Sequence, residues 1–202
     1  MTKVMDPSLR IYRLAVPSLG NSKTAQHCAA QFRSRRMHSP MTNIAYLSLG
    51  SNLGDREAQL RAAVACLQGE GRIVSVSSFY ETEPVEFTDQ AWFLNCAVAL
   101  ETTDTPAQLM AAILRIELQM GRQRIQRKGP RTIDIDILLF GDTILATPAL
   151  TIPHPAMHQR RFVLQPLAEI APAVQHPVLK QTMQELLDAL PAGQTVRKYQ
   201  TS

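Results

Sequence analysis

Between residues 44 and 140, strand and helix signals follow one another in an order that leaves few folds open to this chain. Short apolar runs that end at loop residues predict strands, and apolar stripes of helical period behind capping residues predict helices. The expected strands are 44–49, 72–80, 93–101 and 132–140, and the expected helices are 55–67 and 105–121. This β-α-β-β-α-β order predicts an α+β fold of the ferredoxin-like split βαβ type, with an antiparallel sheet and both helices on one face.

Residues 141–202 are expected to add further elements, for which the second face of the sheet is available. A hairpin is predicted near Gly141, Asp142 and Thr143, and a helix around 182–190. The segment IPHPAMHQRRFVLQPLAEIAP (152–172) lies between them. We find no internal repeat and expect no second core, so residues 41–202 should form one domain with C-terminal additions.

The formal net charge of +4 is distributed unevenly along the chain. Residues 1–40 hold seven basic residues and one acidic residue, a net charge of +6, whereas residues 41–202 hold 14 basic and 16 acidic residues, a net charge of −2. The overall charge is therefore no argument that residues 41–202 bind nucleic acid. The basic leader, residues 1–40, can be a disordered tail, a targeting peptide of the mitochondrial type, or an extension upstream of a true start at Met41.

Cysteine usage and hydropathy indicate the cellular compartment in which the protein is expected. No run of about 18 apolar residues occurs, which argues against a membrane span. Cys28, Cys66 and Cys96 form no CxxC pair, which favours a reducing compartment and hence the cytoplasm. Their periodicity predicts that Cys66 and Cys96 lie in the core. A monomer is expected because no apolar surface stripe is evident.

The strand-like segment RTIDIDILLF (131–140) carries the sharpest chemical signal. Because side chains alternate along a strand, the isoleucines should face the helices, and Asp134 and Asp136 should share the other face, with Cα atoms roughly 6.5–7 Å apart. Two neighbouring carboxylates repel unless a cation lies between them, and Mg²⁺ prefers such oxygen ligands. A solvated polar strand face is the alternative.

A basic loop precedes this strand. Its positive residues are Arg122, Arg124, Arg127, Lys128 and Arg131. Together with the carboxylate pair they predict a metal-bridged polyanion such as a nucleoside triphosphate, because arginine binds phosphate oxygens in a bidentate manner. A solvated helix terminus would explain at most Arg122 and Arg124, but not all five charges.

Two other motifs are less specific. GSNLGD (50–55) follows a strand, but it lacks the lysine of a P-loop, so a tight turn into the helix is favoured over a phosphate cradle. His154 lies between Pro153 and Pro155 in a turn that we expect to be rigid and exposed, shortly before Arg160. It either contacts phosphate or is structural.

Seven segments match a known family in order between Met41 and Leu190. They are LSLGSNLGD, SSFYETEPV, FLNCAV, RIELQMGR, GPRTIDIDILLF, IPHPAMHQRRFVL and PLAEIAP. The chain thereby resembles the 6-hydroxymethyl-7,8-dihydropterin pyrophosphokinases of folate biosynthesis, and GPRTIDIDILLF is the most specific match. The resemblance implies a ferredoxin-like fold with additions and transfer of the β,γ-pyrophosphoryl group of ATP to the pterin hydroxymethyl oxygen. It also implies AMP as the second product and two Mg²⁺ ions.

The resemblance assigns roles by position. Asp134 and Asp136 are the implied metal ligands, and with Arg122 and Arg131 they form the catalytic set. The implied ATP-binding residues are Leu114, Glu117, Arg122, Arg127, Arg131, Ile137, His154 and Arg160. The implied pterin-binding residues are Thr82, Pro84, Val85, Phe93, Asn95, Asp134 and Phe162. Asp134 is the nearest candidate for steering the hydroxyl proton.

Three positions depart from the family pattern. Lys128 replaces an aromatic residue of the basic loop, Phe93 replaces a tyrosine, and Glu86 replaces a frequent glycine. The basic loop therefore lacks the aromatic ring that would stack on the pterin at this position, whereas the aspartate pair is unaffected. The alternatives are a nucleic-acid-binding domain of the same topology, a metal-dependent phosphohydrolase and a pterin-binding protein without catalysis. The first would need an RNP-like aromatic run on the central strands, which is not found.

Overall fold

The main sheet is antiparallel and is built around two long strands in the centre of the molecule. The strands of the chain are β1 (Asn43–Ser51), β2 (Arg72–Val76), β3 (Tyr80–Thr82), β4 (Phe93–Thr102), β5 (Asp134–Phe140), β6 (Leu145–Ala146), β7 (Thr151–Ile152) and β8 (Val196–Lys198). The sheet runs β5-β1-β4-β3-β8, with β2 paired to β4 beside β3, and β6 and β7 form a separate hairpin. This computed structural model describes residues 42–84, 90–122 and 129–200, all within the unit Pro40–Ser202. The leader lies outside the described residues, so its interpretation stays a prediction.

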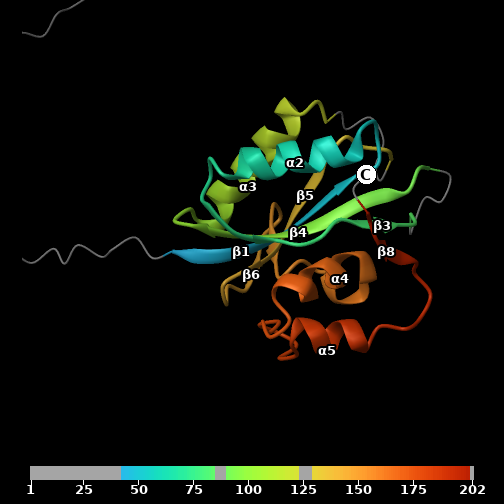
Figure 1. Ribbon diagram of the computed structural model, residues 1–202. Helices are drawn as coiled ribbons and strands as arrows, with labels where there is room; N and C mark the ends of the chain where they lie inside the picture. The colour runs from blue at the N-terminus through green and yellow to red at the C-terminus, as the bar shows by residue number, and fades with distance from the viewer. Residues whose placement is uncertain (1–41, 85–89, 123–128, 201–202) are drawn as a thin grey trace, which may run out of the picture. The chain divides into compact units, whose positions relative to one another are not determined.

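Helices cover both faces of the sheet. They are α2 (Arg56–Leu67), α3 (Pro106–Gln119), α4 (Arg161–Ile170) and α5 (Met183–Asp188), with a short 3₁₀ turn, η2 (Met157–Gln159). Figure 1 shows α2 and α3 on one side of the sheet and α4 and α5 on the other. The α+β class and the antiparallel sheet are thus confirmed. No helix in the described ranges is long and apolar enough to cross a membrane.

Local signals explain why the first helices begin where predicted. The Asp55 side chain caps α2 by accepting a hydrogen bond from the Ala58 N–H at 3.0 Å. At α3, Thr105 and Gln108 form a reciprocal capping box in front of Pro106. Such caps satisfy backbone donors that have no partner within the helix, so they fix the helix start.

The expectation of no second core is wrong. One hydrophobic cluster lies between the sheet and the α2–α3 layer and includes Leu47, Leu60 and Ile113. A second cluster, which includes Leu138 and Leu164, packs α4 and α5 against the other face. Its residues come from β4 and β5, from the segment 152–172, for which the sequence analysis predicted no element, and from α5.

The strand expected at 72–80 is interrupted. β2 ends at Val76 and β3 starts at Tyr80, although both strands pair with β4. Serine hydroxyls explain the break: Ser77 Oγ accepts from the Ala97 N–H at 2.9 Å and donates to the Ser78 carbonyl at 2.7 Å. Serine side chains that bond the backbone in this way compete with regular strand pairing.

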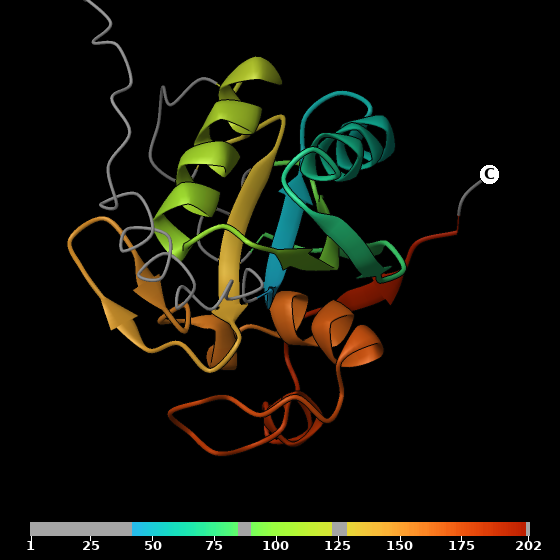
Figure 2. The same cartoon turned by 90° about the vertical axis from the view of Figure 1, so that its left-hand side faces the viewer.

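Other differences lie after residue 130. The last strand of the predicted unit begins at Asp134 rather than at residue 132. A tight turn does occur at Gly141, but the hairpin predicted there lies further on, between β6 and β7. Figure 2 shows this hairpin projecting beside β5. The helix predicted around 182–190 is confirmed as α5, capped by Thr182.

The prediction that both cysteines lie in the core is confirmed for Cys96 and wrong for Cys66. Cys96 is buried in β4, and burial raises the pKa of its thiol to about 12. Cys66 is exposed, because the buried stripe of α2 runs through Leu60, Ala63 and Leu67 and leaves Cys66 on the outer side.

Candidate active site

Strand register brings the predicted metal residues and a predicted pterin residue together. Gly50 of β1 is opposite Asp134 of β5 on one side and opposite Asn95 of β4 on the other. Two residues along, Ser48 is opposite Asp136. Because directly opposite residues point to the same face of a sheet, both aspartates and the Asn95 amide share one face. Gly50 is thus the one residue that lies between Asp134 and Asn95 across the three strands.

The carboxylate pair lies on the face opposite the isoleucines, as expected from the alternation. Ile133, Ile135 and Ile137 are all buried in the cluster beneath α2 and α3. Burial raises the pKa of Asp136, and the neighbouring Asp134 carboxylate raises it further. A cation bound beside Asp136 would favour its charged form and so oppose both effects.

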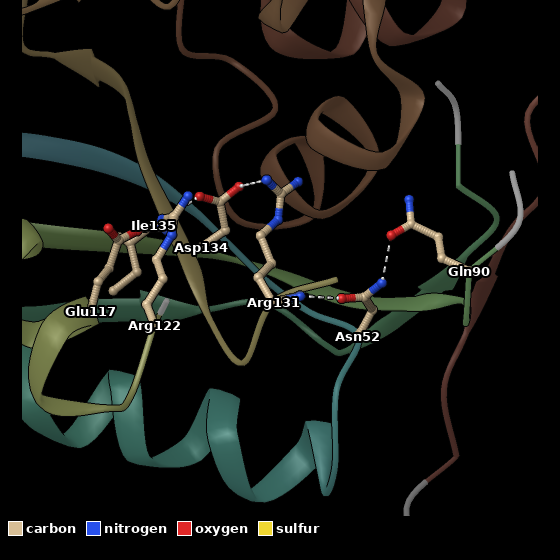
Figure 3. Close-up of polar contacts among 7 residues, drawn as sticks. All are labelled: Asn52, Gln90, Glu117, Arg122, Arg131, Asp134 and Ile135. Carbon is tan, nitrogen blue, oxygen red and sulfur yellow. Dashed lines mark hydrogen bonds and ion pairs between the residues drawn. The ribbon is translucent and has the colours of Figure 1, made fainter. Parts of the chain in front are cut away.

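Two arginines lie against Asp134 (Figure 3). Asp134 is 2.6 Å from Arg122 and 3.2 Å from Arg131. Arg122 also pairs with the carboxylate of Glu117 on α3, which accepts the Ile135 N–H at 2.9 Å. Burial raises the pKa of Glu117, whereas the Ile135 N–H bond and Arg122 lower it. A buried carboxylate on α3 thus fixes both the arginine and the start of β5.

The aromatic residues expected to hold the pterin lie under arginines. The Arg131 guanidinium is 5.3 Å from the Phe93 ring centre, and that of Arg160 is 5.7 Å from the Phe162 ring centre. Each contact is a cation–π arrangement. Within the described part of the chain, the buried Nε of Arg131 has no hydrogen-bond partner. A ligand oxygen could accept from it, because a buried donor costs free energy when it is unpaired.

His154 is half-buried rather than exposed. The backbone N–H of His154 donates to the Leu138 carbonyl of β5 at 2.9 Å. The ring Nδ1 accepts from the backbone N–H of Ala156 at 3.3 Å. Burial lowers the pKa of His154, and Arg160 lowers it further, although Asp134 opposes this. A neutral ring whose Nδ1 accepts must carry its proton on Nε2, so the ring can donate a hydrogen bond to a phosphate oxygen.

Sequence reasoning missed Asn52, which connects three loops. Its Oδ1 accepts from the backbone N–H of Arg131 at 2.8 Å, and its own backbone N–H donates to the Arg131 carbonyl at 3.2 Å. Its Nδ2 donates to Gln90 Oε1 at 3.0 Å and to the Ala91 carbonyl at 3.3 Å. Figure 3 shows Asn52 between Arg131 and Gln90. The only signal was its place in GSNLGD, and an Asn is also typical of an ordinary turn.

The pterin-side residues on the strands are preorganised by one buried hydrogen bond. The Asn95 Nδ2 donates to Thr82 Oγ1 at 2.7 Å, and both residues are buried. A Cβ at Gly50 would lie 2.6 Å from Asn95 Oδ1, so a side chain there would displace the amide. Pro84 is half-buried at the end of the β3 segment, and Val85 lies outside the described residues.

Two predicted ATP-binding residues are not brought to this face, and a third lies outside the described residues. Leu114 is 40% exposed on α3, and Ile137 is 3% exposed with its side chain in the core. A contact between Ile137 and ATP would therefore have to use the main chain. Arg127, together with Arg124 and Lys128, lies outside the described residues.

The residues present fit a magnesium site that is completed by a substrate. In the described ranges, no group of three or more His, Cys, Asp or Glu side chains is placed to hold a metal ion. Asp134 and Asp136 are two carboxylates on one face. Mg²⁺ is often held by one or two carboxylates together with water and phosphate oxygens, so a third protein ligand is not required.

Known proteins resemble this chain in sequence. A model of the 7,8-dihydro-6-hydroxymethylpterin-pyrophosphokinase (HPPK) family matches residues 46–172, more than half of the chain. The 2-amino-4-hydroxy-6-hydroxymethyldihydropteridine pyrophosphokinase of Bacillus subtilis is 51% identical over 137 residues, covering 67% of this chain and 82% of that protein. The protein of the same name from Pseudomonas aeruginosa is 44% identical over 148 residues, covering 72% and 91%.

A longer relative and a solved structure extend the comparison. The folic acid synthesis protein fol1 of Schizosaccharomyces pombe is 39% identical over 201 residues, which cover 96% of this chain but only 27% of that protein. An alignment of that extent includes part of residues 1–40. Crystalline wild-type Plasmodium falciparum HPPK-DHPS has a similar fold, with a TM-score of 0.59 at 20% identity over 73% of this chain and 43% of that one.

The family match rests on the same elements that build the site. Residues 46–172 include most of β1, with Gly50, all of β4 and β5, which carry the buried amide and the carboxylates, and α3 with its buried glutamate. Family membership supports pyrophosphoryl transfer from ATP to hydroxymethyldihydropterin in folate biosynthesis. This chain belongs to the 7,8-dihydro-6-hydroxymethylpterin-pyrophosphokinase family.

Proposed function

We propose that this chain transfers the β,γ-pyrophosphoryl group of ATP to the hydroxymethyl oxygen of 6-hydroxymethyl-7,8-dihydropterin and releases AMP. One observation carries the proposal: Asn95 and Asp134 flank Gly50 on the same face of the sheet. An amide can read the polar edge of a pterin, while the carboxylate belongs to a pair suited to metal-bound phosphate. The two substrates would thus meet across a single glycine.

The proposed chemistry is an in-line displacement. The pterin hydroxyl oxygen bonds to the β-phosphorus, and the bond from that phosphorus to the oxygen bridging the α-phosphate breaks, so AMP leaves with that oxygen. The hydroxyl proton is lost to solvent, and Asp134 is the candidate to orient it. Displacements of this kind depend mainly on positioning and on stabilising charge at the phosphate oxygens.

Arginines supply much of that stabilisation in the proposal. Arg122 and Arg131 would hold phosphate oxygens, and they are preorganised by Glu117 and by Asn52. Donors that are already oriented cost little reorganisation during the reaction. Arg160 and the neutral His154 ring would bind the rest of the triphosphate.

Magnesium would complete the part of the site that binds the triphosphate, which is here called the phosphate side. Asp134 and Asp136 would hold the two Mg²⁺ ions that the family resemblance implies. When bound, such ions neutralise phosphate charge and orient the transferring group. Leu114, Ile137 and Arg127 remain proposed ATP contacts.

On the pterin side we propose two aromatic faces and one polar reader. Phe93 and Phe162 would stack on the flat pterin, and Asn95 would bind its polar edge. Thr82 supports this role because it already holds the Asn95 amide. Pro84 and Val85 remain proposed contacts.

The proposal also covers properties of the whole chain. We propose that the sheet keeps the ferredoxin-like arrangement, because β1, α2, β3, β4, α3 and β5 follow in the expected order. We further propose a monomer that acts in the cytoplasm and binds neither nucleic acid nor membrane. An acidic pair on the substrate-side face would repel nucleic-acid phosphates unless metal were bound.

A product analysis tests the proposed reaction. The protein is incubated with ATP, Mg²⁺ and 6-hydroxymethyl-7,8-dihydropterin, and the nucleotides are separated by chromatography. AMP should form in proportion to pterin diphosphate, and omission of the pterin should abolish it. ADP or free phosphate as the main product would instead identify a phosphohydrolase, and no turnover would contradict the proposal.

A further inference from the structure

The segment Gln194–Arg197 contacts both parts of the proposed pterin side, although it lies far from them in sequence. The strand part consists of Thr82 on β3 with Phe93 and Asn95 on β4, and the helix part is Phe162 on α4. Figure 1 shows β8 alongside β3 at the edge of the sheet, close to α4. The inference drawn from this segment rests on the proposed function.

On the strand part, the segment gives β3 its second neighbour. β3 has only three residues, and β8 pairs with it so that Thr82 is opposite Val196. Just beyond, the Thr195 N–H donates to Glu83 Oε1 at 2.7 Å, and the Glu83 N–H donates to the Thr195 carbonyl at 3.4 Å. A three-residue strand paired on one side only would be easily displaced, so these bonds hold Thr82 in place.

Arg197 extends this support to the start of β4. Its guanidinium binds Glu81 Oε2 through Nε at 3.0 Å and through one terminal nitrogen at 2.7 Å. The same guanidinium lies 4.8 Å from the centre of the Trp92 ring. Arg197 thus contacts the residue before Thr82 and the residue before Phe93 with one planar group.

Arg56 completes the arrangement from α2. It binds Glu81 Oε1 at 2.7 Å and donates to the Trp92 carbonyl at 2.9 Å. The Arg56 hydrogen bond lowers the pKa of Glu81, and Arg197 lowers it too, although burial opposes both. Glu81 is therefore a charged bridge between two arginines, and both arginines also contact Trp92.

On the helix part, the segment contacts the backbone of Phe162. Gln194 Oε1 accepts from the Phe162 N–H at 3.2 Å, which satisfies a donor near the start of α4. Arg161 anchors the preceding residues by donating to the Leu190 carbonyl at 3.0 Å. Consecutive residues, Gln194 and Thr195, therefore bond to the helix part and to the β3 end of the strand part.

We propose that the segment Gln194–Arg197 positions the two parts of the pterin side relative to each other, with Arg197 as its main positioning residue. Arg197 does not touch the reacting atoms. It acts through Glu81 and Trp92 on Thr82 and Phe93. Its loss weakens pterin binding and leaves ATP binding unchanged, because its described partners lie on β3 and at the start of β4, away from the aspartate pair.

The test compares two affinities in one variant. Arg197→Ala and the wild type are titrated by calorimetry with 6-hydroxymethyl-7,8-dihydropterin in the presence of Mg²⁺ and a non-reactive ATP analogue, and separately with the analogue alone. The pterin Kd should rise about fivefold, as expected for a multidentate ion pair on the surface, with the analogue Kd unchanged. Arg197→Lys should recover only part of the loss, because lysine lacks the planar fork.

Lys198→Ala is the matched control. Lys198 is the next residue of β8, is similarly exposed, and contacts Glu169 at 3.4 Å instead of Glu81. It should bind both ligands like the wild type. Thermal unfolding of all three variants should stay close to that of the wild type, since the Arg197 side chain is 64% exposed.

A double-mutant cycle that combines Arg197→Ala with Glu81→Gln tests whether Arg197 acts through Glu81. If Arg197 acts through Glu81, the pterin losses of the two single variants should add to more than the loss of the double variant. Unchanged pterin binding in Arg197→Ala, or equal losses for both ligands, would overturn the inference while leaving the proposed function intact. A wild-type protein that binds no pterin and forms no AMP would overturn the proposed function, and with it the pterin side on which this inference depends.

Discussion

The phosphate side and the pterin side of the site are built in opposite ways. On the phosphate side, the groups are charged: burial and the neighbouring Asp134 raise the pKa of Asp136, and among the described residues the buried Nε of Arg131 has no hydrogen-bond partner. On the pterin side, the Asn95 amide and the Thr82 hydroxyl are buried and already bonded to each other. One side is thus left incomplete for its ligands, and the other is assembled in advance.

This difference suggests how free energy is used. Buried charges without partners are costly, so binding of metal and triphosphate would relieve a cost stored in the fold. A preformed neutral surface cannot gain in that way, and it favours its ligand through shape and by avoiding reorganisation. Substitutions on the two sides should therefore fail differently: phosphate-side changes in turnover, pterin-side changes in affinity.

The largest effect is expected from Asp136→Asn. It keeps the shape of the side chain but removes one of the two carboxylates proposed to hold magnesium. Turnover should fall by at least about 10²-fold, the loss typical of a charge-stabilising group. Steady-state kinetics at saturating substrates measure this, and wild-type-like turnover would sink the metal assignment.

Gly50→Ala should strike the pterin side. The new Cβ would lie 2.6 Å from Asn95 Oδ1 and force the amide aside. Overpacking of this kind costs about 1–3 kcal/mol, so pterin affinity should fall by roughly 5- to 150-fold while the ATP-analogue affinity changes little. Gly69→Ala is the control, because Gly69 lies in the turn between α2 and β2 and is not a residue of the proposed site. This variant should bind pterin normally. An equal loss of both ligands in Gly50→Ala would show that the two sides are not separable.

Asn52→Ala sharpens the comparison, because Asn52 contacts both sides. Its side chain bonds the Arg131 backbone of the phosphate side and Gln90 next to the pterin-side strand. Loss of side-chain hydrogen bonds worth about 1 kcal/mol each should lower kcat/KM several-fold for both substrates. An effect on only one substrate would show that Asn52 serves one side alone, contrary to this expectation.

Deletion of residues 1–40 should have the smallest effect. Strand β1 begins at Asn43, and its described partners are β4 and β5. The shortened chain should keep its turnover and its thermal unfolding midpoint. Because the alignment with fol1 extends into this leader, a large loss of activity would mean that the leader contributes to the enzyme.

Much of the fold follows from local signals in the sequence. β1, α2, β4 and α3 were predicted because each has its own stop or capping residues, such as Asp55 and Thr105. α4 was missed because Pro166 lies inside it and no side chain caps its start. β8 was missed because three residues carry no period, and its pairing joins residues as far apart as Tyr80 and Lys198.

The site divides in the same way. The aspartate pair follows from alternation along one strand, so it could be read from RTIDIDILLF alone. The meeting of Asn95 with Asp134 depends on the register of three strands, and the role of Asn52 depends on loops far apart in the chain. Only the family resemblance pointed to Asn95 in advance, and the sole signal at Asn52 was its place in GSNLGD.

The contrast between the two described thiols has a practical consequence. Cys96 is buried and its pKa is raised to about 12, so it should resist alkylating reagents in the folded protein, whereas Cys66 is exposed on α2. A chain that starts at residue 41 lacks Cys28 and would therefore carry a single accessible thiol. A fluorophore on Cys66 could then follow ligand binding in real time without any engineered cysteine, and the buried Cys96 would report unfolding when it becomes reactive.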